Sequence, residues 1–167
     1  PDCYDWLSLD RRGNWRLQGE RVTHSGLITF INRQYGCDAS GRWFLQNGPQ
    51  RVFVNLAYTP WVYHFSGEAL LNHTGSSAGN PEKCFLDEEG NILLLTPLGI
   101  GLLDDRDLPA FLDACLDEQN AAVDDEKWSV FLSTDHQTRV FWHSLALEKI
   151  VAENVAMKFS YQLNPHP

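Results

Sequence analysis

The six-residue pattern Leu-Asp-x-x-Gly-Asn occurs twice in this chain, at residues 9–14 and 86–91, and each copy leads into an apolar stretch. Asp and Gly are favoured turn residues, because Asp bonds nearby backbone amides and Gly adopts positive φ without steric cost. Each copy therefore predicts a tight turn that opens a strand. The recurrence indicates a small α+β unit used twice; two unrelated hairpin turns are the alternative.

The residues after the first copy predict a short strand, a helix and an antiparallel meander. The helix is expected to be capped by Thr23 or His24 and to end at Gly36. Its apolar stripe consists of Leu27, Ile28, Ile31 and Tyr35. The expected strands, bounded by turn residues, are 15–17, 42–46, 51–56 and 61–65.

The residues after the second copy predict a similar order. A strand at 92–95 is followed by a connector containing Pro97, Gly99 and Gly101, and then by a helix capped by Asp104, Asp105 or Asp107. The helical stripe, at i, i+3, i+4, i+7 and i+8, is Leu108, Phe111, Leu112, Cys115 and Leu116. Further strands are expected at 128–132 and 140–142, as a hairpin around 133–138, and at 158–161; residues 145–155 fit either a helix or a strand with a turn.

The order of these elements predicts an α+β fold of two similar strand–helix–antiparallel meander units packed together. The first unit is expected over residues 1–79 and the second, acidic unit over residues 80–167. A chain of 167 residues with 43% hydrophobic residues can bury a sizeable core.

The net charge of −9 is distributed unevenly along the chain. Residues 1–79 carry seven arginines, no lysine and six carboxylates, whereas residues 80–167 carry six basic residues and sixteen carboxylates. The densest acidic part, residues 104–126, would repel a phosphate backbone, so nucleic-acid binding is not expected. A solvated helix face explains the same residues without a function.

Membrane insertion and disulfide formation are not expected either. No run of about 18 apolar residues is present, and the first residues lack the basic region and apolar core of a signal peptide. The four cysteines are widely spaced, which argues against a zinc site and for reduced thiols. These observations predict a cytoplasmic protein.

The first half resembles bacterial families of uncharacterised proteins. The resemblance is carried by Asp10-x-x-Gly13-x-Trp15-x-x-x-Gly19, a helix, then residues 43–45, 52–54 and 59–62, and Leu71-Asn72-His73-Thr74-Gly75. The most similar are domain-of-unknown-function families that place Asp-Gly-x-Trp before a helix and a β-meander. The resemblance implies two similar α+β halves and a role in ligand binding or signalling, and it supplies no catalytic residues. The acidic second half departs from the pattern.

A strand face and one loop suggest a ligand site. In the strand at 61–65, Trp61, Tyr63 and Phe65 share one face, and His64 lies on the other. If Arg42 and Arg51 lie beside that aromatic face, they would form a pocket for a small anion. An aromatic core with arginines paired to carboxylates is the alternative.

The loop at 72–80 contains small residues, hydroxyls and backbone donors that can cradle an anion, although it lacks a Walker lysine. A flexible connector between the halves is the alternative reading of this loop. The candidate ligand-binding residues are therefore Arg42, Arg51, Trp61, His64, Asn72, His73, Thr74, Ser76 and Ser77.

No catalytic residue, metal or cofactor is predicted. His64, His73, His136 and His143 lack the spacing of a metal motif, although the predicted strands could bring them near one another. There is no Gly-x-Ser-x-Gly elbow, and Cys37 follows a helix end and not a helix start, where its pKa would be lowered.

The sequence therefore favours a non-catalytic module that binds a small, anionic ligand or takes part in signalling. The alternative is a protein-interaction or assembly module that uses a sheet edge or the acidic helix. A hydrolase of unknown type is a third, weaker interpretation. The expected partners are a small anionic ligand or a protein.

Overall fold

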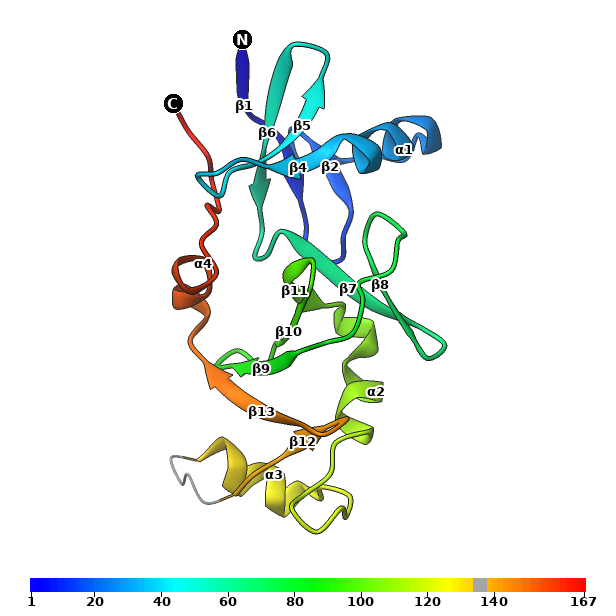
Figure 1. Ribbon diagram of the computed structural model, residues 1–167, viewed down its shortest axis with the longest axis vertical. Coiled ribbons are helices and arrows are strands. Elements are labelled where there is room, and N and C mark those ends of the chain that lie inside the picture. Colours follow the sequence, from blue (N-terminus) through cyan, green and yellow to red (C-terminus); the bar gives the residue numbers. More distant parts are fainter. Residues whose placement is uncertain (134–137) are drawn as a thin grey trace.

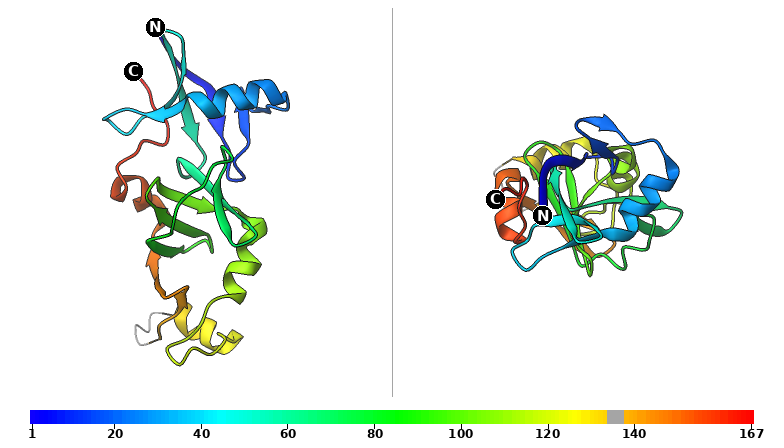
Figure 2. Two further views of the ribbon diagram at one scale, coloured as in Figure 1. Left: turned by 45° about the vertical axis from the view of Figure 1, so that its right-hand side comes forward. Right: turned by 90° about the horizontal axis from the view of Figure 1, so that it is seen from above.

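Two mixed sheets follow one another along the long axis of the molecule (Figure 1). The computed structural model describes residues 1–133 and 138–167. Both chain termini lie at the end formed by the first sheet, and the second sheet extends toward the opposite end (Figure 1). The turned views place helix α1 (Ser25–Gln34) and helix α4 (Val155–Lys158) on opposite sides of the molecule, with α4 at the level where the two sheets meet (Figure 2).

The first sheet has the strand order β3-β2-β1-β6-β5-β4. Its neighbours pair antiparallel except β1 and β6, which are parallel. The elements of this part are β1 Asp2–Leu9, β2 Trp15–Leu17, β3 Glu20–Arg21, α1 Ser25–Gln34, β4 Tyr35–Cys37, β5 Trp43–Asn47 and β6 Gln50–Leu56.

The second sheet has the strand order β12-β13-β9-β10-β11-β7-β8, with parallel pairs β13–β9 and β11–β7. Its strands are β7 Trp61–Ser66, β8 Ala69–Asn72, β9 Lys83–Asp87, β10 Ile92–Thr96, β11 Gly99–Leu103, β12 Phe141–Trp142 and β13 Leu145–Ile150. The helices are η1 Asp105–Asp107, α2 Leu108–Asp113, α3 Asp125–Leu132, η2 Ala152–Asn154 and α4 Val155–Lys158.

The two sheets share one topology. In the first, the β1–β2–β3 meander leads through α1 to β4, β5 and β6, and β6 returns parallel to β1. In the second, β9–β10–β11 leads through α2 to Leu116, an additional helix, α3, precedes β12 and β13, and β13 returns parallel to β9. Leu116 bridges both Ala122 and Phe141 in the place where β4 pairs with β5. The predicted α+β fold with two similar halves is confirmed.

The β7–β8 hairpin has no counterpart in this shared pattern. It belongs to the second sheet, because β7 pairs with β11, although its residues precede position 79. Sheet membership therefore changes between β6 and β7. The domain boundary between residues 79 and 80 stays a prediction.

Both copies of the repeated pattern form the same turn. Oδ1 of Asp10 accepts hydrogen bonds from the backbone amides of Arg12 and Asn14, both at 2.9 Å, and Gly13 has a φ of 82°. The turn at Asp87 has the equivalent bonds from residues 89 and 91, at 2.9 and 2.8 Å, and Gly90 has a φ of 88°. The turns join β1 to β2 and β9 to β10, as expected from turn chemistry.

Two further aspartates form this turn. Oδ1 of Asp38 accepts from the amides of residues 40 and 42, and Oδ1 of Asp117 from those of residues 119 and 121. The left-handed position is filled by Gly41 and by Asn120. These turns follow β4 and Leu116, which are themselves equivalent, so each half uses the turn twice at matching places.

Helix α1 lies close to its predicted bounds. His24 caps it by accepting the Leu27 amide on Nδ1 at 3.1 Å, and Ile31 on its inner face is buried. The predicted strand at 128–132 is wrong, because these residues belong to α3. Asp124 caps α3 by accepting the Lys127 amide at 2.8 Å, and acidic residues occupy its first turn, where they complement the helix dipole.

Other local predictions also differ from the structure. Gly99 and Gly101 lie in strand β11 and not in a connector. Residues 158–161 form no edge strand: Lys158 ends α4, and Ser160 has a φ of 58° in the following turn. Residues 145–155 divide into β13 and a helical segment, and strands β1 and β9 were not predicted. Of the predicted loop at 133–138, residues 134–137 lie outside the described part.

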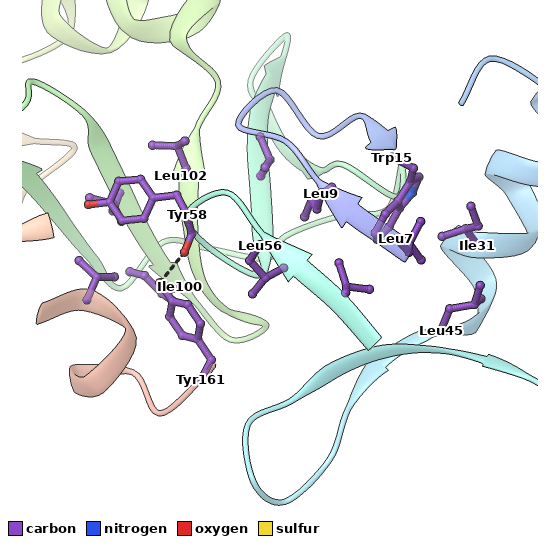
Figure 3. Packing of buried hydrophobic residues seen from close by; sticks show 14 of the residues in the cluster. Leu7, Leu9, Trp15, Ile31, Leu45, Leu56, Tyr58, Ile100, Leu102 and Tyr161 are labelled. Atoms are coloured by element: carbon purple, nitrogen blue, oxygen red, sulfur yellow. Dashed lines mark hydrogen bonds between the residues drawn. The ribbon is translucent and has the colours of Figure 1, made fainter. Parts of the chain in front are cut away.

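The first hydrophobic core is continuous between the two sheets. Leu7, Leu9, Trp15, Ile31 and Leu45 fill its first-sheet side, and Figure 3 shows them packing toward Tyr58, Ile100, Leu102 and Tyr161. A second core lies between the second sheet, α2 and α3 and includes Tyr63, Phe111, Phe131 and Trp142. The C-terminal segment returns to the first sheet, where Leu56 donates its amide to the Leu163 carbonyl at 2.8 Å.

Candidate functional site

Arg42 and Arg51 lie on the outer face of the first sheet. Both guanidinium groups stack over the ring of Phe53, at 4.6 and 5.2 Å from its centroid. Arg42 donates to Asp38 at 2.8 Å, and Arg51 pairs with Asp2 at 3.2 Å. Each arginine therefore has a carboxylate partner, which matches the alternative that the sequence left open.

Trp61 and His73 lie on the other, inner side of the first sheet. There they form a ring cluster with Trp15, Tyr35 and Trp43, and the ring centroids are 4.9 to 5.5 Å apart. The sheet thus separates the aromatic candidates from the two arginines, because side chains alternate across a strand. The ligand-binding role of these residues stays a prediction.

His73 is the most constrained residue of the ring cluster. Its Nδ1 accepts the Val62 amide at 3.1 Å, so the neutral ring carries its proton on Nε2. Nε2 is buried and has no hydrogen-bond partner among the described residues. Burial, with a smaller effect of His64, lowers the pKa of His73 to about 3. The imidazole is therefore a neutral packing group at physiological pH.

The loop after β8 uses its polar side chains within itself. Oδ1 of Asn72 accepts hydrogen bonds from the backbone amide of Thr74, at 2.7 Å, and from the Thr74 hydroxyl. Nδ2 of the Asn72 side chain donates to Ser76 Oγ at 3.0 Å. Ser77 Oγ accepts the Gly79 amide at 3.1 Å. The loop is thus an ordered turn closed by its own side chains.

The second sheet is curved, so that its two ends approach each other. Phe65 of β7 and Trp142 of β12 belong to opposite ends of the strand order, yet their ring centroids are 6.1 Å apart and nearly parallel. A groove of about 870 Å³ lies along this seam, between the edge strand β8, helix α2 and the β12–β13 turn. We call it the seam groove.

The walls of the seam groove are mainly apolar. Its apolar lining consists of Phe65, Ala69, Leu70, Pro81, Ala110, Ala114, Trp142 and Leu145. The polar side chains on its walls are those of Glu68, Ser77, Asn80 and His143. Of the residues predicted to bind a ligand, Ser77 lines this groove and the others do not.

The turn at one end of the groove is strained. His143 and Ser144 join β12 to β13 with φ values of 46° and 68°. Two consecutive left-handed residues define a tight hairpin turn that favours Asn-Gly, and other side chains cost about 1–2 kcal/mol each. In this turn the centroid of the His143 ring lies 4.5 Å from that of Trp142, at the groove wall.

The described residues contain no metal cluster, and the pKa values of three cysteine thiols are raised. Burial raises the pKa of Cys84 and of Cys115 to about 12, and burial with Asp38 raises that of Cys37. In residues 1–133 and 138–167, no three His, Cys, Asp or Glu side chains converge as a metal site would require. His136 lies outside this part. No described helix has both the length and the apolar character needed to cross a bilayer.

No sequence signal marks the seam groove in advance. Its walls come from four separate stretches, around residues 65–70, 77–81, 110–114 and 142–145. Only the curvature of the second sheet brings them together. The one local hint is His143-Ser144 between two apolar pairs, where a hairpin turn normally carries Asn or Gly.

The fold and the groove define a two-repeat α+β protein with a groove at an open sheet seam. A family model, DUF2944, described as "Protein of unknown function (DUF2946)", matches residues 1–166. The chain belongs to this family of uncharacterised proteins, so the resemblance to a domain-of-unknown-function family is confirmed. A search of curated proteins found no match.

Two solved structures are similar to this chain. The crystal structure of a DUF1285 family protein from Silicibacter pomeroyi is 15% identical and has a TM-score of 0.56; the match covers 92% of this chain and 83% of that one. A DUF1285 family protein from Shewanella baltica is also 15% identical and has a TM-score of 0.48; the match covers 63% of this chain and 88% of that one. At such identity, the first comparison indicates a shared fold alone.

Proposed function

We propose that this protein is a non-catalytic module that binds a small molecule in the seam groove. The observation that carries the proposal is the groove itself, with about 870 Å³ of space and apolar walls at the junction of β8, α2 and β12. Small-molecule sites have volumes of roughly 300–1,000 Å³ and pair apolar walls with a few polar groups. The groove has both properties.

The polar groups of the groove are few and are placed around its rim. Glu68 follows Gly67 in the β7–β8 turn, Ser77 and Asn80 lie on the connector to β9, and His143 lies in the strained β12–β13 turn. Strained residues persist where the surrounding structure holds them and are frequent at binding sites. This arrangement supports a ligand whose apolar body enters the groove.

The proposed site differs from the one expected from the sequence. Arg42 and Arg51 are paired with carboxylates on the outer face of the first sheet, and neither lines the seam groove. The described groove walls carry no lysine or arginine. The proposal therefore keeps the small-molecule function expected from the sequence, but it assigns the binding site to the seam groove.

Binding of 1-naphthalenemethanol, a neutral aromatic probe, tests this proposal. Amide NMR signals around residues 65–70 and 142–145 should shift on titration, and the probe should raise the unfolding temperature as its concentration exceeds Kd. A110W, which places an indole in the groove, should weaken binding about tenfold or more. Q34W, at the exposed end of α1, is the matched control and should bind as the natural protein does. Shifts distributed away from the groove, or retained in A110W, would contradict the proposal.

A further inference from the structure

Glu68 is the one formally charged side chain on the described walls of the seam groove, with histidine counted as neutral. Its carboxylate makes no hydrogen bond or ion pair within the described part of the chain. In contrast, three carboxylates of the Asp turns, those of Asp10, Asp38 and Asp117, each bind a cationic side chain. Glu68 thus presents a negative charge at the rim of an apolar groove without an internal partner.

The remaining electrostatic features of the groove have the same sign. Ala114, on one wall, is the C-cap of α2, the end where the helix dipole is negative and favours cations. Residues 80–167, which include the groove walls at 110–114 and 142–145, carry an excess of ten carboxylates over basic residues.

We propose that the seam groove recognises an organic cation: a ligand with an apolar or aromatic body in the groove and an amine that pairs with Glu68. This inference rests on the proposed function and names the class of its ligand. The body is bound by apolar walls, and the charge is selected by the carboxylate of Glu68 and the C-terminal end of α2. A carboxylate or phosphate ligand would meet repulsion from the same groups.

Three naphthalene probes of nearly equal shape test the charge selection. They are 1-naphthylmethylamine, 1-naphthalenemethanol and 1-naphthoate, which carry a positive charge, no charge and a negative charge at pH 7. Calorimetric titration should show the amine binding about 3- to 5-fold tighter than the alcohol, with the naphthoate weakest. The preference should decrease at high salt, because Glu68 is exposed at the rim.

Removing the carboxylate should remove the preference. E68Q should reduce the difference between amine and alcohol to less than about twofold, because it weakens binding of the amine more than binding of the alcohol. E20Q removes the same charge from the exposed strand β3, far from the groove walls, and should keep the preference. This pair separates local recognition from the overall negative charge.

The outcomes distinguish the ligand class from the function. Equal binding of amine and alcohol, tighter binding of the naphthoate, or equal weakening of amine and alcohol by E68Q would overturn the organic-cation inference and leave the proposed function standing. If none of the probes shifts the groove signals, both are overturned. A preference that survives in E68Q would assign the selection to other groups and overturn the role of Glu68.

Discussion

Tyr58 donates its phenolic hydrogen bond to Oδ2 of Asp87 at 2.7 Å, and both side chains are buried. Tyr58 follows the last strand of the first sheet, whereas Asp87 forms the first turn of the second repeat. The bond therefore ties the two halves together. The equivalent oxygen of Asp10 accepts from Arg16 of its own hairpin, at 3.0 Å. The aspartate of the turn thus binds a residue of its own hairpin in the first half and a residue of the other sheet's segment in the second.

Replacing Tyr58 with Phe should destabilise the fold by about 1–3 kcal/mol, because it leaves a buried carboxylate oxygen with one donor fewer. Burial, together with Asp87, raises the pKa of Tyr58, so the phenol stays protonated and donates. Urea unfolding of Y58F gives the change. Y4F, at the ring that stacks on Phe53 of the outer face, is the control and should change stability by less than about 0.5 kcal/mol. Equal effects in the two variants would refute the assignment.

Gly13 and Gly90 occupy the same position of the two repeated turns but have different surroundings. Both adopt positive φ, yet a Cβ on Gly13 would lie 2.6 Å from Cβ of His73, whereas a Cβ on Gly90 would meet nothing within 4 Å. Gly90→Ala should therefore cost about 1 kcal/mol from backbone strain alone.

Gly13→Ala should cost about 1–3 kcal/mol more than its counterpart, because the ring cluster around His73 is closely packed and must shift. Denaturant unfolding of the two variants, with the natural protein as reference, isolates the packing contribution from the turn contribution. Identical losses at the two positions would show that the first turn does not bear on His73.

Acidification should destabilise this protein through His73. Its pKa is about 3 in the folded state and about 6.5 when unfolded, so the unfolded chain binds a proton below pH 6.5 that the folded chain does not. The stability therefore falls as pH falls, by about 2 kcal/mol between pH 7 and pH 5 from this group. Above pH 6.5, the pKa of the unfolded state, His73 is neutral in both states and does not reduce the stability.

Urea unfolding at pH 7 and pH 5 checks this dependence. H73F should be less stable at pH 7, since the Val62 amide loses its acceptor, and its stability should vary less between the two pH values. H166F, near the exposed C-terminus, should keep the dependence of the natural protein. An unchanged slope in H73F would mean that other groups carry the acid sensitivity.

Relieving the backbone strain in the β12–β13 turn beside the seam groove should stabilise the fold. Ser144→Gly relieves a left-handed residue and is expected to stabilise the fold by about 0.5–1.5 kcal/mol. Ser40→Gly is the control: Ser40 does not have a positive φ, so the change should be neutral or mildly destabilising. Thermal unfolding of both variants measures the difference. Destabilisation by Ser144→Gly would indicate that the serine side chain contributes more than the strain costs.

Local signals explain which elements could be predicted. The helix at Ser25–Gln34 has its own cap and apolar stripe, and the strands at 43–47, 50–56 and 61–66 are bounded by turn residues. The strand predicted at 128–132 failed because alternating apolar residues also occur on a short helix, and the cap at Asp124 decided the outcome.

Glycines illustrate the limit of such signals. Gly99 and Gly101 suggest a connector, but a Cβ on Gly101 would lie 2.3 Å from Cε2 of Tyr63, so this strand contains glycine to let a buried ring approach its backbone. The neighbour that explains the residue is more than thirty positions away. The residues close to Gly101 in the sequence therefore give no sign of this packing.

The sequence by itself determined the turns, because each depends on residues within a few positions of one another. The recurrence of the turn pattern indicated two similar halves, and composition alone gave their charge contrast. Only the tertiary structure decided which candidate residues meet. Alternation across β5 and β6 separates the arginines from Trp61, and the curvature of the second sheet brings Phe65 next to Trp142. Both follow from strand pairing between distant segments, which sets the register and the face of every side chain.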